Sequence, residues 1–434
     1  MIRNRTAIVA LLTGLNFLNY LDRFIVAAVL PRIKEDLGLS NFEAGLLATV
    51  FLLGYFVTSP LFGSLGDRLP RKRLIAFGVF TWSAATIASG LSESVWTLII
   101  ARAFVGIGEA SYATLAPTII DDITPPEKKG KMLAIFFLAI PLGSALGYLL
   151  GGLIQDIWGW REAFFVGGGP GIALAFLCLW IEEPVRKLAK TAVAFGATIR
   201  TLVALPLYRR AVLGYCAHTA AIGAFSYWAP TFLSERFFTQ LATDPLAPKA
   251  AEQVLKSANF WFGVTTVIAG ALGTIIGGRM ADRALAGLPS VPPDAPHDDP
   301  RNGRAANAQL RVCAIGVAIA FPFSAAAFFA PSPMLFFVLA GIAEIGLFLS
   351  TAPINAIMLR TAPPYMRASA MAIAIFAIHL FGDLWSPTLL GLALDYLLPA
   401  VAMMALPLGF AIATAVWWPR PHEAEVIPAA RVQD

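Results

Sequence analysis

The stretch Gly63-Ser-Leu-Gly-Asp67-Arg68-Leu-Pro-Arg71-Lys72-Arg73 is a cluster of charge between two long apolar runs. A shorter version, Gly278-Arg-Met-Ala-Asp282-Arg283, occurs in the same setting 215 residues later. Four cations cannot lie in hydrocarbon, so the first stretch must lie at a membrane surface. Its recurrence indicates that the chain contains two copies of one membrane unit.

The composition is that of an integral membrane protein. Hydrophobic residues make up 58 % of the 434 residues, charged residues only 14 %, and the mean hydropathy is +0.71. A soluble domain carries about 25 % charged residues. The net charge of +5 is distributed between the apolar runs instead of over one face, so we expect membrane lipids and no nucleic acid as partners. Three scattered cysteines have no metal-ligand spacing, and no metal is expected.

Apolar segments long enough to cross about 30 Å of hydrocarbon form two sets of six. They lie near 7–30, 44–62, 74–91, 96–120, 132–155 and 163–181, and near 207–234, 257–277, 310–330, 334–359, 368–393 and 398–418. The sequence therefore predicts an all-α integral membrane protein with twelve transmembrane helices in two six-helix bundles. We expect an N-terminal bundle over 1–182, a linker with an interfacial helix over 183–206, a C-terminal bundle over 207–418 and a tail over 419–434.

The distribution of Lys and Arg gives the orientation. With the N-terminus inside, the inner segments hold 24 of the 32 Lys and Arg residues and the outer segments hold six. This bias predicts that both termini are cytoplasmic. The segment 284–308, rich in Pro, Asp and Arg and without periodicity, is expected to be a flexible cytoplasmic insertion.

The first and fourth spans each carry two ionic side chains. The first contains Asn19-Tyr20-Leu21-Asp22-Arg23, and the fourth contains Arg102 and Glu109. Helical rise places Asp22 and Arg102 at similar depth, level enough to pair, while Arg23 can extend into a cavity or toward Glu109. These four ions are either a static clamp between the two helices or a functional set in which a carboxylate takes up a proton and an arginine holds an anionic substrate group.

Five motifs together resemble a known family. The loop at 63–73 resembles the signature loop between helices 2 and 3 of the major facilitator superfamily. Arg102-x-x-x-Gly106-x-Gly108-Glu109 is similar to the helix 4 motif of its proton-coupled members. The segment 19–23, Tyr227-Trp228-Ala229-Pro230 and Gly273-Thr-Ile-Ile-Gly277 resemble the spinster-like branch, which includes bacterial members.

The resemblance implies a secondary active transporter that works by alternating access, with a proton gradient as driving force and no cofactor. Spinster-like proteins move lysophospholipids and sphingoid phosphates. The resemblance would make Arg23 the phosphate contact, and Asp22 and Glu109 the protonation sites. It also implies a monomer in a bacterial inner membrane and a central site between the two bundles.

Further substrate contacts are expected beside Arg23. They are polar or aromatic side chains within the spans, namely Arg102, Asn19, Tyr20, Trp228 and Glu344. The second half of the chain is poorer in charge, which indicates that the first half handles charge and the second supplies an apolar wall suited to an acyl chain or to plain packing.

The charged loop has two interpretations. Its cations can simply set topology, but an acid in a basic inner loop contributes nothing to topology. The family implies a latch in which Asp67, held near the start of helix 11 or by a neighbouring Arg, closes the inner side. The residues of this expected conformational latch are Gly63, Asp67, Arg68, Arg71, Asp282 and Arg283.

The antiporter motif of helix 5 is only partly present. Gly143, Gly147, Gly151 and Gly152 keep its small-residue stripe, but Tyr148 stands where a proline usually follows the glycine. Such a stripe is more often close helix packing than a functional signature.

Two alternatives to lipid transport remain open. One is a proton-coupled exporter of drugs or other small hydrophobic compounds. The other is a membrane protein that does not transport, as an enzyme or a sensor. An enzyme is not expected, because no nucleophile has a base and an orienting group at readable spacing.

Overall fold

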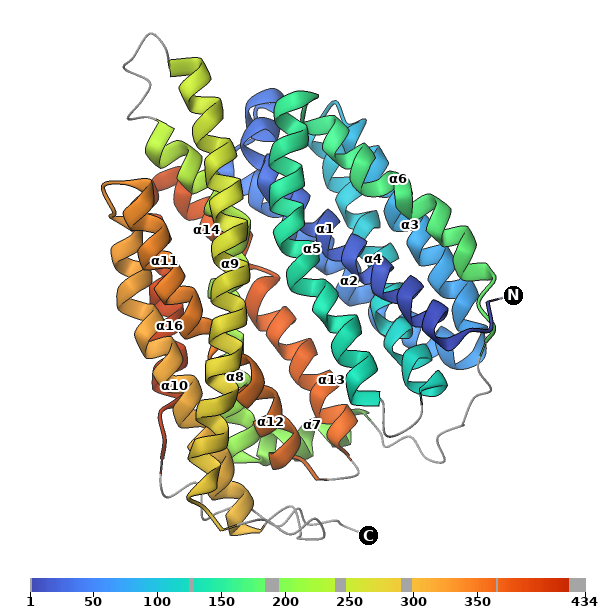
Figure 1. The fold of residues 1–434 in the computed structure, drawn as a ribbon, viewed down its shortest axis with the longest axis vertical. Coiled ribbons are helices and arrows are strands. Elements are labelled where there is room, and N and C mark those ends of the chain that lie inside the picture. The colour runs from blue at the N-terminus through green and yellow to red at the C-terminus, as the bar shows by residue number, and fades with distance from the viewer. Residues whose placement is uncertain are drawn as a thin grey trace. The chain divides into compact units, whose positions relative to one another are not determined.

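The computed structural model describes residues 2–124, 129–183, 195–238, 247–289, 299–363 and 366–420. Within these ranges the regular structure is helical, apart from one isolated bridge between Ile2 and Ile181 (Figure 1). The prediction of an all-α chain is confirmed. The chain divides into two compact units, which do not follow the sequence halves.

Unit 1 comprises Met1–Leu188, Ser226–Val267 and Pro387–Pro399. Its first six helices are α1 (Arg5–Leu37), α2 (Asn41–Arg68), α3 (Arg71–Gly90), α4 (Val95–Ile123), α5 (Lys129–Ile157) and α6 (Trp160–Leu179). Among them α1 packs on α5, α2 on α4, and α3 on both α4 and α6. Side-chain caps fix where they begin: Ser40 forms a capping box at the start of α2 and Ser94 one at the start of α4.

Unit 2 comprises Ala189–Phe225, Ile268–Ser386 and Ala400–Asp434. The helices of the second half are α7 (Phe195–Ala204), α8 (Pro206–Phe238), α9 (Ala247–Ala286), α10 (Pro300–Phe328), α11 (Pro333–Phe348), α12 (Thr351–Thr361), α13 (Arg367–Ile378), the π-helix η3 (His379–Asp383), α14 (Ser386–Tyr396), α15 (Pro399–Met403) and α16 (Ala405–Trp417). Four of these, α8, α9, α14 and, by its first residue, α15, contribute residues to unit 1 as well. Helix α7 lies in the linker; its position on a membrane surface stays a prediction.

Ten helical segments of the described chain are long and apolar enough to cross a membrane. Helices α3 and α8 are outside this set. Helix α3 opens with Arg71-Lys72-Arg73, and α8 holds Arg209, Arg210 and His218 among its apolar residues. Adding these two helices gives twelve, consistent with the predicted number.

Several predicted spans are interrupted helices. The predicted span near 334–359 consists of α11 and α12, and the span near 368–393 consists of α13, η3 and α14. The last span, near 398–418, consists of α15 and α16. In η3 the His379 imidazole lies 2.9 Å from the Asp383 carboxylate. A π-helix adds one residue to the turn, which re-aims the side chains that follow it.

The expectation of an aperiodic segment over 284–308 is wrong at both ends. Helix α9 continues to Ala286, and α10 already begins at Pro300. Asp299 caps α10 by accepting the backbone N–H of Arg301 at 2.8 Å, and Pro300 occupies the first helical position, where its missing N–H costs nothing. Residues 290–298 lie outside the described residues.

Small residues set the distance between α1 and α5. A Cβ atom added to Gly143 would lie 2.5 Å from the Phe17 carbonyl oxygen, and one added to Gly147 would lie 2.6 Å from the Leu21 carbonyl oxygen. The interpretation of this stripe as close helix packing is therefore confirmed. Tyr148, the departure from the family pattern, is buried and donates its hydroxyl to the Ser226 carbonyl.

Candidate functional site: an ionic cluster on α1 and α4

Two glycines place α4 deep within unit 1. There is no room for a Cβ atom on Gly106 because the Phe51 carbonyl of α2 lies against it, and a Cβ on Gly108 would lie 2.5 Å from the Gly78 carbonyl oxygen of α3. The glycines of the helix 4 motif thus let two neighbouring backbones approach closely. This packing carries Arg102 and Glu109, which flank the glycines in sequence, into the interior of the unit.

The centre of the site is an ion pair between α1 and α4. The Nε atom of Arg23 lies 2.7 Å from Oε2 of Glu109. The Glu109 side chain is fully buried, whereas 18 % of the Arg23 side chain is exposed. The expected approach of Arg23 to Glu109 is present. Because Glu109 is buried and Arg23 is partly exposed, another group can reach the Arg23 side chain without moving α4.

Aromatic rings surround the Arg23 guanidinium. Its carbon lies 5.0 Å from the ring centroid of Tyr20, 5.0 Å from that of Phe51 and 5.2 Å from that of Tyr55. Cation–π contacts of this kind contribute about 0.5–2 kcal/mol each, more when they are dry. They hold a cation in place while leaving its N–H donors available for an anion.

Asp22 and Arg102 are close in depth but do not pair directly. Within the described part of the chain, Asp22 accepts a hydrogen bond from the Thr86 hydroxyl of α3 at 2.7 Å, and Arg102 forms no ion pair. The Arg102 guanidinium lies over the Phe51 ring instead, 4.9 Å from its centroid. The expected Asp22–Arg102 pair is therefore wrong in this structure, because a hydroxyl on α3 and a ring on α2 supply the two side chains with other neighbours.

Buried polar atoms remain without hydrogen-bond partners across this cluster. They are Nδ2 of Asn19, Oδ1 of Asp22, Nε and Nη1 of Arg102, and Oε1 of Glu109. An unmade hydrogen bond on a buried polar atom costs about 1–3 kcal/mol, so folding alone gives no reason to keep five of them. Donors and acceptors of both signs are thus held ready for a ligand, a proton or water.

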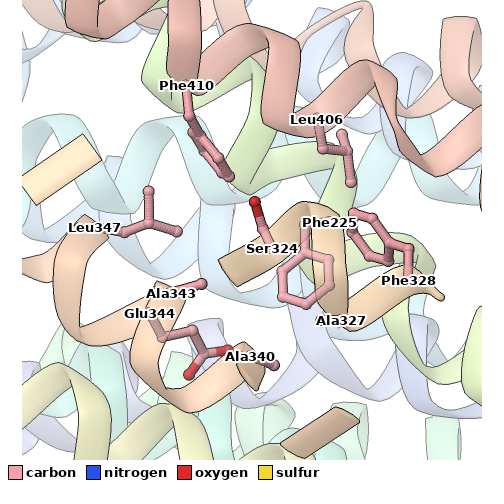
Figure 2. A pocket seen from close by; sticks show the side chains of 10 residues that line it. All are labelled: Phe225, Ser324, Ala327, Phe328, Ala340, Ala343, Glu344, Leu347, Leu406 and Phe410. Atoms are coloured by element: carbon pink, nitrogen blue, oxygen red, sulfur yellow. The ribbon is translucent and has the colours of Figure 1, made fainter. Parts of the chain in front are cut away.

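Two expected substrate contacts lie elsewhere. Trp228 is fully buried in unit 1 and donates its indole N–H to the Pro387 carbonyl at 2.8 Å, so it packs α8 on α14. Glu344 lies in unit 2 and is 5 % exposed. Figure 2 shows its carboxylate beside a small, mostly apolar cavity that Ser324 and the rings of Phe225 and Phe410 also line.

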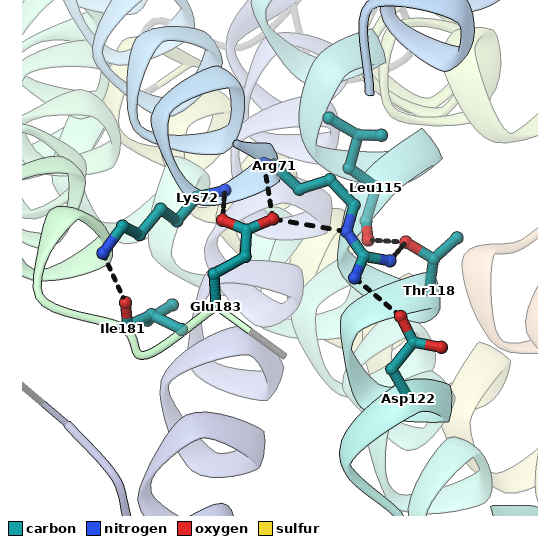
Figure 3. Close-up of polar contacts among 7 residues, drawn as sticks. All are labelled: Arg71, Lys72, Leu115, Thr118, Asp122, Ile181 and Glu183. Atoms are coloured by element: carbon teal, nitrogen blue, oxygen red, sulfur yellow. Dashed lines mark hydrogen bonds and ion pairs between the residues drawn. The ribbon is translucent and has the colours of Figure 1, made fainter. Parts of the chain in front are cut away.

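Arg71 and Lys72 of the charged loop bind other residues of the N-terminal half. Figure 3 shows Arg71 of α3 reaching Asp122 of α4, with Nη2 at 2.6 Å from Oδ2, and Thr118, with Nη1 at 2.9 Å. Glu183, which follows α6, accepts the backbone N–H groups of Arg71 at 2.7 Å and Lys72 at 3.2 Å. Arg71 therefore fastens three helix ends of one bundle together, a role that goes beyond setting topology.

The other expected latch residues differ in environment. Arg68 is exposed at the end of α2, and Asp282 and Arg283 are exposed near the end of α9. A Cβ atom added to Gly63 would lie 3.7 Å from the Thr114 side chain, which is ordinary van der Waals contact. The side chain of Asp67 lies outside the described residues, so the inner latch stays a prediction.

Three residues of the cluster are additions to the predicted set: Phe51 and Tyr55 on α2, and Thr86 on α3. Phe51 and Tyr55 are spaced four residues apart, which puts two aromatic rings on one helical face. That spacing is equally typical of core packing. Their position against two arginines could be found only once α2 and α4 were placed together.

Comparisons with known proteins show the family to which the chain belongs. The family model of the Major Facilitator Superfamily matches residues 12–382. Human "Protein spinster homolog 1" is 35 % identical over 404 residues, covering 90 % of this chain and 73 % of the relative. The "Sphingosine-1-phosphate transporter SPNS2" of Danio rerio is 33 % identical over 431 residues, covering 95 % of this chain and 82 % of that protein.

Solved structures share the fold. A bacterial homologue of the human lysosomal transporter spinster, described as inward-facing and unoccupied, superimposes with a TM-score of 0.78 at 21 % identity, covering 98 % of both chains. A D-xylose–proton symporter gives a TM-score of 0.72 at 17 % identity, also covering 98 % of both chains. The chain therefore belongs to the major facilitator superfamily and, within it, to the spinster transporters.

Proposed function

We propose that this protein moves a lipid-like amphiphile with an anionic or zwitterionic head group, of the lysophospholipid or sphingoid-phosphate type, by proton-coupled alternating access. The observation that carries the proposal is the Arg23–Glu109 pair, in which an arginine with a partly exposed side chain is held by aromatic rings and by one buried carboxylate. A phosphate group is a strong, bidentate partner for arginine. The relative from Danio rerio is named for a sphingoid phosphate.

Coupling follows from competition for one guanidinium. While Glu109 is ionised it holds Arg23, and the head group must compete with it. When Glu109 takes up a proton, its attraction for Arg23 falls and the guanidinium becomes available to phosphate. Proton binding at Glu109 and phosphate binding at Arg23 thereby favour one another, as linkage requires. Asp22, with one carboxylate oxygen unpaired, is the second candidate proton carrier.

The remaining orphan groups fit the same ligand. Arg102 has two unpaired guanidinium nitrogens and Asn19 an unpaired amide nitrogen. These are hydrogen-bond donors, as phosphate oxygens require. We therefore assign Arg102 and Asn19 to the head group together with Arg23, and Tyr20 to the wall that positions Arg23.

A multidrug exporter is the second candidate. The aromatic rings around the cluster would also suit a hydrophobic cation. The unpartnered carboxylate oxygens of Asp22 and Glu109, which would also suit a cation, are assigned to protons in this proposal. The unpartnered donors of Arg102 and Asn19 then favour an anionic head group over a cationic drug.

Flux into liposomes separates the two candidates. Purified protein would be reconstituted and given either a fluorescent lysophospholipid or a cationic dye, each with and without a pH gradient across the membrane. The proposal predicts protein-dependent movement of the lysolipid that the gradient accelerates. Movement of the dye alone would reject the lipid assignment, and lysolipid movement that ignores the gradient would reject coupling.

A further inference from the structure

The start of α2 and the end of α14 meet inside unit 1. Asn41 and Phe42, the first two residues of α2, direct their backbone N–H groups to the two carboxylate oxygens of Asp395, each at 2.9 Å. The Ser40–Glu43 capping box serves other groups of this terminus and leaves these two N–H groups free to bind a carboxylate from elsewhere. A helix N-terminus attracts an anion through its unpaired N–H groups and its dipole.

The backbones of the two helices are in close contact at this point. A Cβ atom on Gly45 of α2 would lie 2.5 Å from the Pro387 carbonyl oxygen, and there is no room for one on Gly391 because of the Asn41 carbonyl. One helical turn further along α2, the hydroxyls of Thr49 and Thr388 lie 2.6 Å apart. The helices therefore fit together over several turns and not only at one charged group.

The motif Tyr227-Trp228-Ala229-Pro230 serves the same junction. The Tyr227 hydroxyl donates to the Ala44 carbonyl of α2 at 2.6 Å, and Trp228 donates to the Pro387 carbonyl at the start of α14. Beside them Lys34 of α1 pairs with Glu235 of α8 at 2.8 Å. All these residues lie in unit 1, and α8 and α14 each continue in the chain into unit 2.

We propose that Asp395, bound to the N-terminus of α2, is an outer latch that closes the transport path at the end opposite the charged loop. This inference rests on alternating access in the proposed function, since the latch must open and close in each cycle. Asp395 is exposed to solvent, so water can replace its two N–H partners when the helices separate. The predicted inner latch at Asp67 would use the opposite ends of the same two spans, 2 and 11.

Distances between spin labels report on the latch without any substrate. Labels would be placed on cysteines introduced at Trp96 and Leu398, whose side chains are 69 % and 74 % exposed in unit 1, after Cys178, Cys216 and Cys313 are replaced by alanine. Double electron–electron resonance in nanodiscs would give the populations of short and long distances. Asp395→Asn should raise the ratio of long to short distances roughly two- to tenfold. The control is Glu93→Gln, an exposed acid in the loop between α3 and α4, which should leave the ratio unchanged.

Asn41 offers a test of the backbone partner itself. Asn41→Pro removes one N–H donor at the first position of α2, where proline is tolerated, and Ser40 already has the extended conformation that proline requires before it (ψ 160°). Asn41→Ala loses the same side chain, including its contact with Lys34, but keeps the N–H. The proline variant should therefore shift the ratio further than the alanine variant, and this extra shift should vanish in an Asp395→Asn background.

Two results overturn the latch: unchanged distances in Asp395→Asn, or equal shifts for the two Asn41 variants. The distances do not depend on transport. If lysolipid flux fails while the distances shift as described, the proposed substrate is wrong and the latch stands. If flux is normal and the distances do not shift, only the latch is wrong.

Discussion

At the scale of single residues, Arg23 has the arrangement expected of a group that exchanges partners. A buried ion pair recovers in Coulomb attraction roughly what it loses in desolvation, so it is a weak source of stability. Here the Glu109 carboxylate is fully buried, while 18 % of the Arg23 side chain is exposed. That asymmetry favours a working pair over a static clamp.

Arg23→Lys should separate charge from shape. Lysine keeps the positive charge but loses the planar fork that binds phosphate and stacks on Tyr20 and Tyr55. We expect the half-saturating concentration of lysolipid phosphate to rise roughly fivefold or more, corresponding to about 1 kcal/mol. Initial rates in proteoliposomes over a range of substrate concentrations measure this. The exposed Arg73→Lys is the control, and equal kinetics in both variants would remove Arg23 from the head-group site.

At the scale of helices, glycines decide which helices touch. The glycine pairs of α1 with α5, and of α4 with α2 and α3, bring backbones together and leave the ionic side chains as the groups between them. In lipid there is no hydrophobic force between apolar helices, so such close approach is the main source of their association.

Gly106→Ala should destabilise the site from a distance. The added methyl group meets the Phe51 carbonyl carbon at 2.9 Å and must push α2 away from α4. We expect a loss of about 1–3 kcal/mol in stability and a lower melting temperature. Gly14→Ala in α1 is the control, because nothing lies within 4 Å of its added Cβ atom. A melting temperature for Gly106→Ala equal to that of Gly14→Ala would contradict the packing argument.

Arg71 provides a second prediction at this scale. Arg71→Gln removes the guanidinium that joins Asp122 and Glu183. These two partly buried carboxylates then lose their shared cation. Stability should fall by about 1–3 kcal/mol. Arg73→Gln removes the same topogenic charge from an exposed position and should change little. Thermal unfolding of both variants in detergent tests this prediction. Similar melting temperatures would mean that Arg71 acts only by setting topology.

The features that could be predicted from the sequence are those that depend on hydropathy and charge. The two sets of spans and the ionic residues of the first and fourth spans could be predicted, because the free-energy cost of placing a charge in hydrocarbon depends on the residue type alone. The partner of Asp22 could not be found this way, since Thr86 competes with Arg102 only once α3 is packed on α4. The π-helix η3 could not be predicted either, because a single inserted residue leaves the apolar pattern almost unchanged.

At the scale of the whole molecule, the two units differ in their chemistry. The ionic cluster lies on α1 and α4 of unit 1, while the described cavity of unit 2 beside Glu344 is lined mainly by apolar and aromatic groups. The anionic head group of the proposed substrate would therefore be bound by residues of unit 1.

The central claim is that Glu109 carries the proton that moves with the lipid. It is tested most directly by counting protons: proteoliposomes with an internal pH dye are given lysolipid phosphate without an imposed gradient, and dye response is compared between the native protein and Glu109→Gln. We expect lysolipid addition to change the internal pH for the native protein and for the control Glu93→Gln. In Glu109→Gln the lipid should still exchange across the membrane while the pH stays constant. A pH change in Glu109→Gln equal to that of the native protein would contradict the account.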